Sequence, residues 1–199
     1  MNPTQSNSIQ EEVIRTFLKV IAREGFAGAS LEAIAKEAGV DSIDLGRRFP
    51  SIIELAHQVT EKLLHRLDST VPEPGGDLET QLKSFASDYW EFWQQYPGIL
   101  AYYWEAGKNS QLKNMVREKQ NKTREKVVDF FAFYRKHGSF IQELDELDDQ
   151  ELEHELVGAF LGSIFSRVTW QTFGIVKARF NVDRHVHCFL KGYGRPARN

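Results

Sequence analysis

The chain has 199 residues, 41% of them hydrophobic and 27% charged, a composition that is ordinary for a globular protein. The formal net charge of −3 does not favour a strongly basic nucleic-acid binder, and the single cysteine, Cys188, excludes an internal disulfide. No apolar run in the sequence reaches the length of a membrane span, and the first residues lack the pattern of a signal peptide. We therefore expect a cytoplasmic protein without a membrane segment.

Hydrophobic periodicity predicts helices throughout the N-terminal part of the chain. The first is expected over residues 8–25, where Ser8 opens a capping box. A second helix follows Ser30 and ends at Gly39, a residue that easily adopts the left-handed conformation of a helix end. Asp41 can cap a third helix, which buries Leu45 and ends before Pro50. Two short helices joined by a glycine-containing turn predict a helix-turn-helix.

The remaining sequence predicts a helical body. A connecting helix is expected over residues 51–69, and the prolines and glycines of residues 71–76 break the chain after it. Further helices are expected over residues 77–96, in a short aromatic segment that ends at Gly107, and over residues 110–136, 149–173 and 182–193. The predicted fold is all-α with about nine helices. We place a helix-turn-helix domain at residues 1–50 and a ligand-binding and dimerisation domain at residues 51–199, with residues 51–69 as the connector.

The helix-turn-helix carries a pattern of residues whose order and spacing are those of a known family. The matching positions are Gly25, Phe26, Ser30, Leu31, Ile34, Ala35, Ala38, Gly39, Val40, Leu45, Phe49, Pro50, Ser51, Glu54 and Leu55. They resemble the N-terminal domain of the TetR family of all-helical, homodimeric transcriptional regulators. The resemblance implies that the N-terminal helices bind a palindromic operator and that a small-molecule effector in the C-terminal body changes the separation of the two DNA-reading heads. The DNA-binding residues that it implies are Ser30, Ser42, Ile43, Asp44, Gly46, Arg47 and Arg48.

Several positions depart from the family pattern, among them Ala29, which stands where the family often has a threonine before Ser30, and two positions that contact the DNA backbone. Gly46 stands where the family has an aromatic residue that grips the DNA backbone, and Ile52 stands at the position of a phosphate-binding lysine. Residues 31–55 contain three basic and five acidic side chains, which gives this segment a charge of −2. Phosphate neutralisation supplies most non-specific DNA affinity, so these departures weaken the predicted grip on DNA. The alternative hypothesis is a TetR-like sensor or adaptor that has lost DNA binding and acts through a protein partner.

Aromatic residues are dense between Phe85 and Trp104 and again between Phe130 and Tyr134. Most such residues form a core, but a helical cavity lined in this way also suits an apolar or aromatic ligand. In the resembled family the helical body holds such an inducer. The candidate ligand-binding residues are Phe85, Tyr89, Phe92, Trp93, Tyr103, Trp104, Phe131, Tyr134, Arg167 and Trp170.

The helix predicted over residues 149–173 is apolar on more than one side, which requires neighbours on both sides. A symmetric helical pair is the commonest solution, so we expect a homodimer. Gly158, Gly162 and Ser166, each four residues apart, would let a second backbone approach closely. The candidate interface residues are Leu156, Gly158, Gly162, Phe165, Ser166, Val186, Phe189 and Leu190.

No pattern in the sequence indicates a metal, a cofactor or a catalytic site. His185, His187 and Cys188 invite a metal hypothesis, but ligands one residue apart do not share a helix face. Nucleophile elbows, phosphate-binding loops and HExxH motifs are absent from the sequence, and we expect no enzyme activity. A third hypothesis, a ligand-binding protein with incidental catalytic activity, is the weakest. Residues 108–136 carry a charge of +6 and the segment 143–155 is acidic, so the two segments can attract each other within a chain or across a dimer.

Overall fold

The computed structural model describes residues 3–175, 177 and 179–195, and its secondary structure is helical apart from an isolated antiparallel bridge between Phe140 and Gly194. This confirms the expected all-α fold. The chain divides into two compact units. The first contains residues 1–65 and 95–119, and the second contains residues 66–94 and 120–199. Within the described residues, no helix combines the length and hydrophobicity that crossing a membrane would need.

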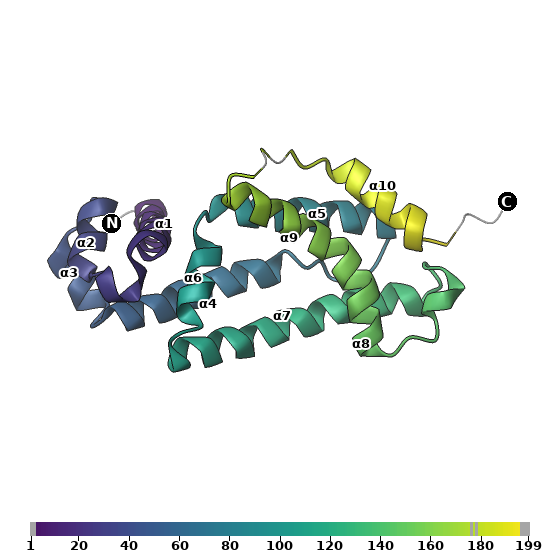
Figure 1. Ribbon diagram of the computed structural model, residues 1–199, viewed down its shortest axis with the longest axis horizontal. Helices are drawn as coiled ribbons and strands as arrows, with labels where there is room; N and C mark the ends of the chain where they lie inside the picture. Colours follow the sequence, from purple (N-terminus) through teal and green to yellow (C-terminus); the bar gives the residue numbers. More distant parts are fainter. Residues whose placement is uncertain (1–2, 176, 178, 196–199) are drawn as a thin grey trace. The chain divides into compact units, whose positions relative to one another are not determined.

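The first unit begins with α1 (Pro3–Gly28), which is interrupted at Gly25, where φ is 65°. The helix starts at Pro3 instead of the expected Ser8, because proline is favoured at the first helical position and no helix breaker follows it before Gly25. α2 (Leu31–Ala38), α3 (Ser42–Arg48) and the start of α4 (Ile52–Ser69) follow. Figure 1 shows α1, α2 and α3 grouped together.

α6 (Ile99–Ala106) also belongs to the first unit, although α5 separates it from α1–α4 along the chain. It packs against α1: the Tyr102 ring lies 5.5 Å from Phe17 and 6.1 Å from Phe26, measured between ring centroids. Gly98, at φ 98°, begins this helix where an added Cβ would stand only 3.1 Å from the Leu18 carbonyl oxygen of α1. The close approach of the two backbones therefore depends on glycine.

The second unit is built from α5 (Leu78–Gln95), the later part of α7 (Ser110–Lys136), α8 (Asp149–Leu152), α9 (Gly158–Thr172) and α10 (Val182–Tyr193). A cluster of phenylalanine rings joins these helices. Phe160 of α9 lies 5.7 Å from Phe85, 5.8 Å from Phe131 and 5.0 Å from Phe189, measured between ring centroids. The contacts with Phe131 and Phe189 are edge-to-face, and such contacts add to the stabilisation that burial of the rings provides.

The predicted helix over residues 149–173 forms as α8 and α9, joined by a π-helical turn at Glu153–Val157. Its core positions are spaced four residues apart at Leu152, Leu156, Phe160, Ile164 and Val168, each of them buried. An α-helix has 3.6 residues per turn, so a row with a spacing of four drifts around its surface. The wider π turn reduces this drift, and the row stays directed at the core of the unit.

An ion pair between Arg124 of α7 and Glu153 joins the basic and acidic segments within the chain. Lys83 adds a second link in this unit, since its Nζ lies 2.9 Å from Glu79 and 3.0 Å from Asp183 of α10. The side chains of these pairs are partly to largely exposed, and each pair contributes little to stability.

Candidate functional site

The turn between α2 and α3 forms as the sequence indicates. Ser30 caps α2 by accepting a hydrogen bond from the Ala33 amide at 3.1 Å. Gly39 ends the helix with φ 67° and ψ 29°, and the Val40 amide donates to the Ala35 carbonyl at 3.0 Å. A glycine in the left-handed region satisfies the last carbonyls of α2 and turns the chain sharply into α3.

The cap of α3 is Asp41, whose Oδ1 accepts hydrogen bonds from the amides of Ile43 at 2.8 Å and Asp44 at 2.9 Å. The helix is anchored by Leu45, which is 5% exposed. The remaining positions point away from the core. All seven DNA-binding candidates are exposed: Ser30, Ser42, Ile43, Asp44, Gly46, Arg47 and Arg48.

The arginines of α3 have neighbours at the surface. Arg47 Nη1 lies 3.6 Å from Asp44 Oδ1, and both side chains are more than three-quarters exposed. The Arg48 guanidinium lies 5.8 Å from the centre of the Phe49 ring. Exposed pairs of this type are weak, so both cations can exchange these contacts for phosphate oxygens or base edges at small cost.

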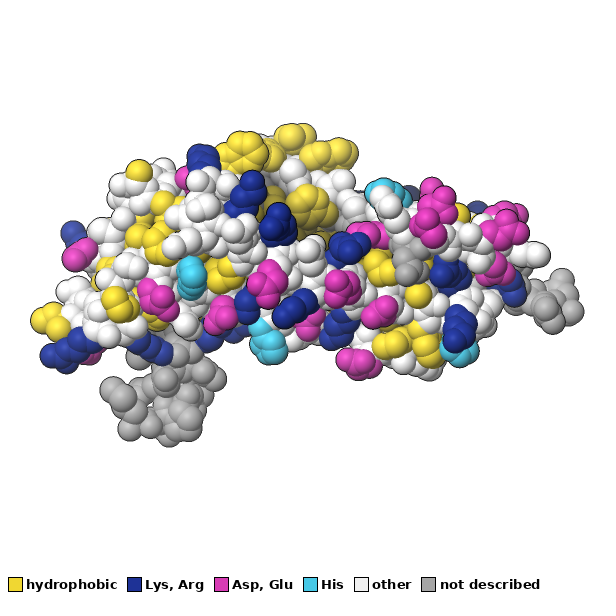
Figure 2. Space-filling view, turned by 90° about the horizontal axis from the view of Figure 1, so that it is seen from below, with side chains coloured by type: hydrophobic (Ala, Val, Ile, Leu, Met, Phe, Trp, Pro, Cys, Tyr) yellow, Lys and Arg dark blue, Asp and Glu magenta, His cyan; other side chains and the backbone are white. Residues whose placement is uncertain are grey.

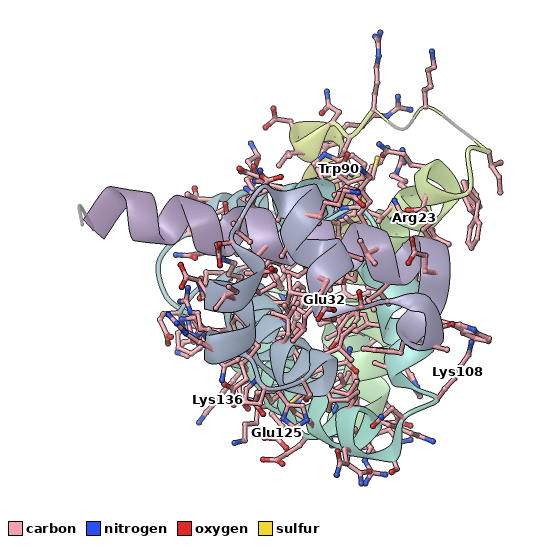
Figure 3. The ribbon with its side chains drawn as sticks, turned by 90° about the vertical axis from the view of Figure 1, so that its left-hand side faces the viewer. Arg23, Glu32, Trp90, Lys108, Glu125 and Lys136 are labelled. Carbon is pink, nitrogen blue, oxygen red and sulfur yellow. The ribbon has the colours of Figure 1, made fainter. Side chains whose placement is uncertain are left out.

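Basic residues on α1 hold α2 in place. The Glu37 carboxylate forms ion pairs with Lys19 at 2.7 Å and with Arg23 at 3.0 Å. The hydrogen bonds from these two side chains lower the pKa of Glu37, and the bond from Lys19 has the larger effect. Figure 3 marks Arg23 on α1 and Glu32 on α2. The face shown in Figure 2 also mixes basic and acidic side chains. Lys19 and Arg23 therefore contribute to the attachment of α2 as well as to the surface charge.

The structure shows what occupies the two DNA-backbone positions that depart from the family pattern. A Cβ added at Gly46 would have no heavy atom within 4 Å, so no close packing requires glycine there. Ile52, the first residue of α4, is half-buried. The position of the family's aromatic residue is thus open surface, and that of its lysine is partly used for packing.

Tyr102 links three helices of the first unit, a feature that the sequence analysis missed. Its hydroxyl donates to the Ala56 carbonyl of α4 at 3.2 Å and contacts the Thr60 hydroxyl, while its ring packs on Phe17 of α1. Burial raises the pKa of Tyr102 to about 12, so the phenol is neutral. Tyr96, just before α6, donates to Glu11 of α1 at 2.6 Å. The only sequence signal for these contacts is the aromatic density itself, because bonds between distant residues have no local pattern.

The ligand candidates of the second unit form one aromatic group. Phe85 and Phe131 are fully buried and belong to the core of the unit. Tyr89 lies 5.9 Å from Trp93 between ring centroids, and burial raises its pKa to about 12. Phe92 lies 5.4 Å from Trp93 by the same measure.

The other ligand candidates either lie outside this aromatic group or already make contacts within the protein. The Tyr134 hydroxyl donates to the Gly75 carbonyl at 2.7 Å and so holds the turn before α5. Arg167 and Trp170 are exposed on α9. Tyr103 and Trp104 lie on α6 of the first unit, where Trp104 is 75% exposed.

The dimer candidates separate into two sets. Leu156 of the π-helical turn and Val186 and Phe189 of α10 are buried in the core of the second unit, which they share with residues of α5 and α7. The homodimer interface stays a prediction, and these three buried side chains leave it to the exposed candidates. Leu190 is half-buried against the same core. Gly158, Phe165 and Ser166 are exposed, and a Cβ at Gly162 would meet nothing within 4 Å.

His185, which the sequence analysis considered only as a metal ligand, packs against two aromatic rings. Its ring lies 4.9 Å from Phe160 and 5.3 Å from Phe180 between centroids, and its Nδ1 lies 3.3 Å from the Ser163 hydroxyl. Burial, assisted by the charge of Arg167, lowers its pKa to about 4. Among the described residues, no group of three His, Cys, Asp or Glu side chains is arranged to hold a metal ion.

The architecture matches solved structures along almost the whole chain. A TetR family transcription regulator from Marinobacter aquaeolei VT8 superposes with a TM-score of 0.69, covering 98% of this chain and 100% of that chain at 14% sequence identity. The chain has the TetR fold. The flavonoid-responsive regulator FrrA also superposes on this chain, with a TM-score of 0.61 at 21% identity over 96% of this chain and 100% of that chain.

A third similar structure is that of the fatty acid degradation regulator FadR from Bacillus halodurans. The superposition covers 96% of this chain and 94% of that chain, with a TM-score of 0.62 and 16% identity. By sequence, no family model and no curated protein matches this chain. The likeness is therefore one of fold, and the chemistry of the chain has to be argued from its own residues.

Proposed function

We propose that the protein is a TetR-like DNA-binding transcriptional regulator, a repressor that a small apolar or aromatic ligand releases from its operator. The observation that carries this proposal is α3, a capped helix anchored by Leu45 that directs Arg47 and Arg48 to the surface directly after a helix-turn-helix turn. In this motif the second helix enters the major groove of DNA, and a homodimer binds two half-sites of a palindrome.

The charges of the first unit support a weak and salt-sensitive grip on DNA. Arg47 has an acidic neighbour, and Lys19 and Arg23 are paired with Glu37. Gly46 and Ile52 supply no phosphate contact through their side chains. Sequence discrimination would then depend on base contacts more than on general phosphate attraction.

The proposed effector site lies in the second unit, around Tyr89, Phe92 and Trp93. The Trp93 indole Nε1 is buried without a hydrogen bond of normal geometry, although the side chain is only 6% exposed. A buried donor that lacks a hydrogen bond of good geometry costs free energy, and a ligand with an acceptor oxygen would reduce that cost. FrrA is a flavonoid-responsive regulator, and FadR regulates fatty acid degradation. An effector as hydrophobic as a flavonoid or a fatty acid would suit this aromatic group.

α6 offers the route by which a ligand would act on the DNA-binding helices. It follows α5 directly in the chain, and Tyr102 ties it to α1 and α4. A ligand that displaces α6 would therefore displace α1 and α4 as well, and with them the separation of the two α3 helices in a homodimer. Such a switch requires that the ligand binds the DNA-competent and DNA-incompetent states with different affinity.

The test is selection of genomic fragments by the purified protein, followed by anisotropy titration of selected and random duplexes at several salt concentrations. We expect selected duplexes to bind more tightly than random ones. The variant Ile52→Lys should strengthen binding to both kinds of duplex and steepen the log–log salt dependence by about one unit, since it adds one phosphate contact. If neither protein binds any selected duplex at low salt, the repressor proposal is wrong. The adaptor that acts through a protein partner then becomes the better account.

A further inference from the structure

Ile43 is a large apolar side chain that the fold does not use. It is 64% exposed, whereas Leu45, two residues later, is 5% exposed and anchors the same helix. Among the large hydrophobic residues described in the first unit, only Trp104 is as exposed. A β-branched residue also lacks the high helix propensity that would explain its choice at a solvent-facing helical position.

The surroundings of Ile43 leave it free to insert into a groove. Positions 43, 46 and 47 lie on one helix face, because residues three and four apart are neighbours on a helix surface. Gly46 has no side chain, and an added Cβ would meet nothing within 4 Å. Ile43 and Arg47 therefore project from this helix face on either side of a position without a side chain, and Arg48 is exposed beside them.

The occupant that fits this surface is duplex DNA. In a helix-turn-helix the early residues of the second helix contact base edges in the major groove. Thymine is the base that presents a methyl group there, and an apolar side chain is its natural contact. The neighbouring arginines favour a polyanion as the occupant. An apolar protein surface would instead require both guanidinium groups to lose their water without gaining a partner.

We propose that Ile43 determines operator specificity by packing on a thymine methyl group, once in each half-site. This inference rests on the proposed DNA-binding function and adds a base preference to it. Ile43 does not touch the phosphates in this arrangement, so its contribution is to discrimination between sequences and not to general affinity.

The test replaces single thymidines of a selected duplex by deoxyuridine, which removes the 5-methyl group and leaves the base pairing intact. Burial of a methyl-sized group corresponds to about 0.8 kcal/mol, or about a fourfold change in Kd. The affinity of wild type should fall about fourfold when one particular thymidine of a half-site is replaced, and roughly 15-fold when the corresponding thymidines of both half-sites are replaced. The variant Ile43→Ala should bind the thymidine and deoxyuridine duplexes equally. Its melting temperature should match that of wild type, because Ile43 is exposed.

Ile175→Ala is the matched control, since Ile175 is another exposed isoleucine, at 67%, and lies in the second unit. It should keep the full sensitivity to deoxyuridine. The inference is overturned if no deoxyuridine weakens wild type by more than about twofold, or if Ile43→Ala retains the sensitivity of wild type. Both results leave DNA binding itself in place. Failure of all these proteins to bind any duplex at low salt would instead overturn the proposed function, and with it a role for Ile43 on DNA.

Discussion

Tyr102 is the residue through which α6 contacts α1 and α4, and its substitution tests that arrangement. Tyr102→Ala removes a fully buried ring that packs on Phe17 and Phe26 and a hydroxyl that bonds to α4. Truncation of a buried aromatic side chain to alanine costs about 3–5 kcal/mol. Tyr102→Phe removes only the hydroxyl. Thr60 keeps its own 2.7 Å hydrogen bond to the Ala56 carbonyl, so no buried acceptor is orphaned, and we expect a cost of about 0.5–1.5 kcal/mol.

The measurement is urea denaturation followed by circular dichroism, with the free energy of unfolding extrapolated to water. A double-mutant cycle with Thr60→Val should give a coupling energy of about 0.5–1.5 kcal/mol, because the two hydroxyls are in contact.

The contribution of Tyr102 to the free energy of unfolding also depends on pH. Its pKa is about 12 in the folded protein against an ordinary value of 10.0, so the folded state holds the proton more tightly. The contribution is complete below pH 10 and is lost as the pH rises through 12.

Two results would refute this account. One is a cost below about 1 kcal/mol for Tyr102→Ala, which would mean that α6 does not depend on the ring. The other is a Tyr102→Phe variant that is as unstable as Tyr102→Ala, which would place the whole effect in the hydroxyl. A matched control is Tyr193→Phe, on α10 of the second unit, where the half-buried ring packs 5.2 Å from Phe189.

Three further predictions follow from single contacts. Gly98→Ala should destabilise the protein by about 1–3 kcal/mol in the same urea assay, because φ is 98° and the new Cβ would stand 3.1 Å from the Leu18 carbonyl oxygen; a neutral result would contradict the close packing of α1 and α6. Gly162→Leu fits the protomer, since the position is open, and should weaken the homodimer in sedimentation; an unchanged dimer, or a monomeric wild type, would refute the proposed interface. His185→Phe keeps the ring contact with Phe160 but removes a group whose pKa is lowered to about 4, so wild type should lose stability as the pH falls from 6.5 through 4 while the variant loses less; parallel pH profiles would contradict this.

The sequence determined the local features of this protein. Ser30, Gly39, Asp41 and Ser51 act within a few residues of their own position, by capping a helix or by adopting a left-handed turn, and the structure contains each of these features. The order of the helices and the all-α class follow from periodicity, which is also a local property. The exposure of the α3 candidates was predictable for the same reason, because the buried position Leu45 fixes the orientation of a short helix.

The tertiary structure alone decided which apolar faces meet each other. Residues 149–173 carry two apolar stripes, and the sequence could not say that Leu156 and Phe160 face the core of the second unit while Phe165 remains exposed. It also could not place α6 against α1, or the Tyr102 hydroxyl against Ala56, 46 residues away in the chain. Hydrophobic burial is non-directional, so an apolar stripe predicts that a helix face is buried but does not predict which element buries it. That choice is made by the packing of all the helices together.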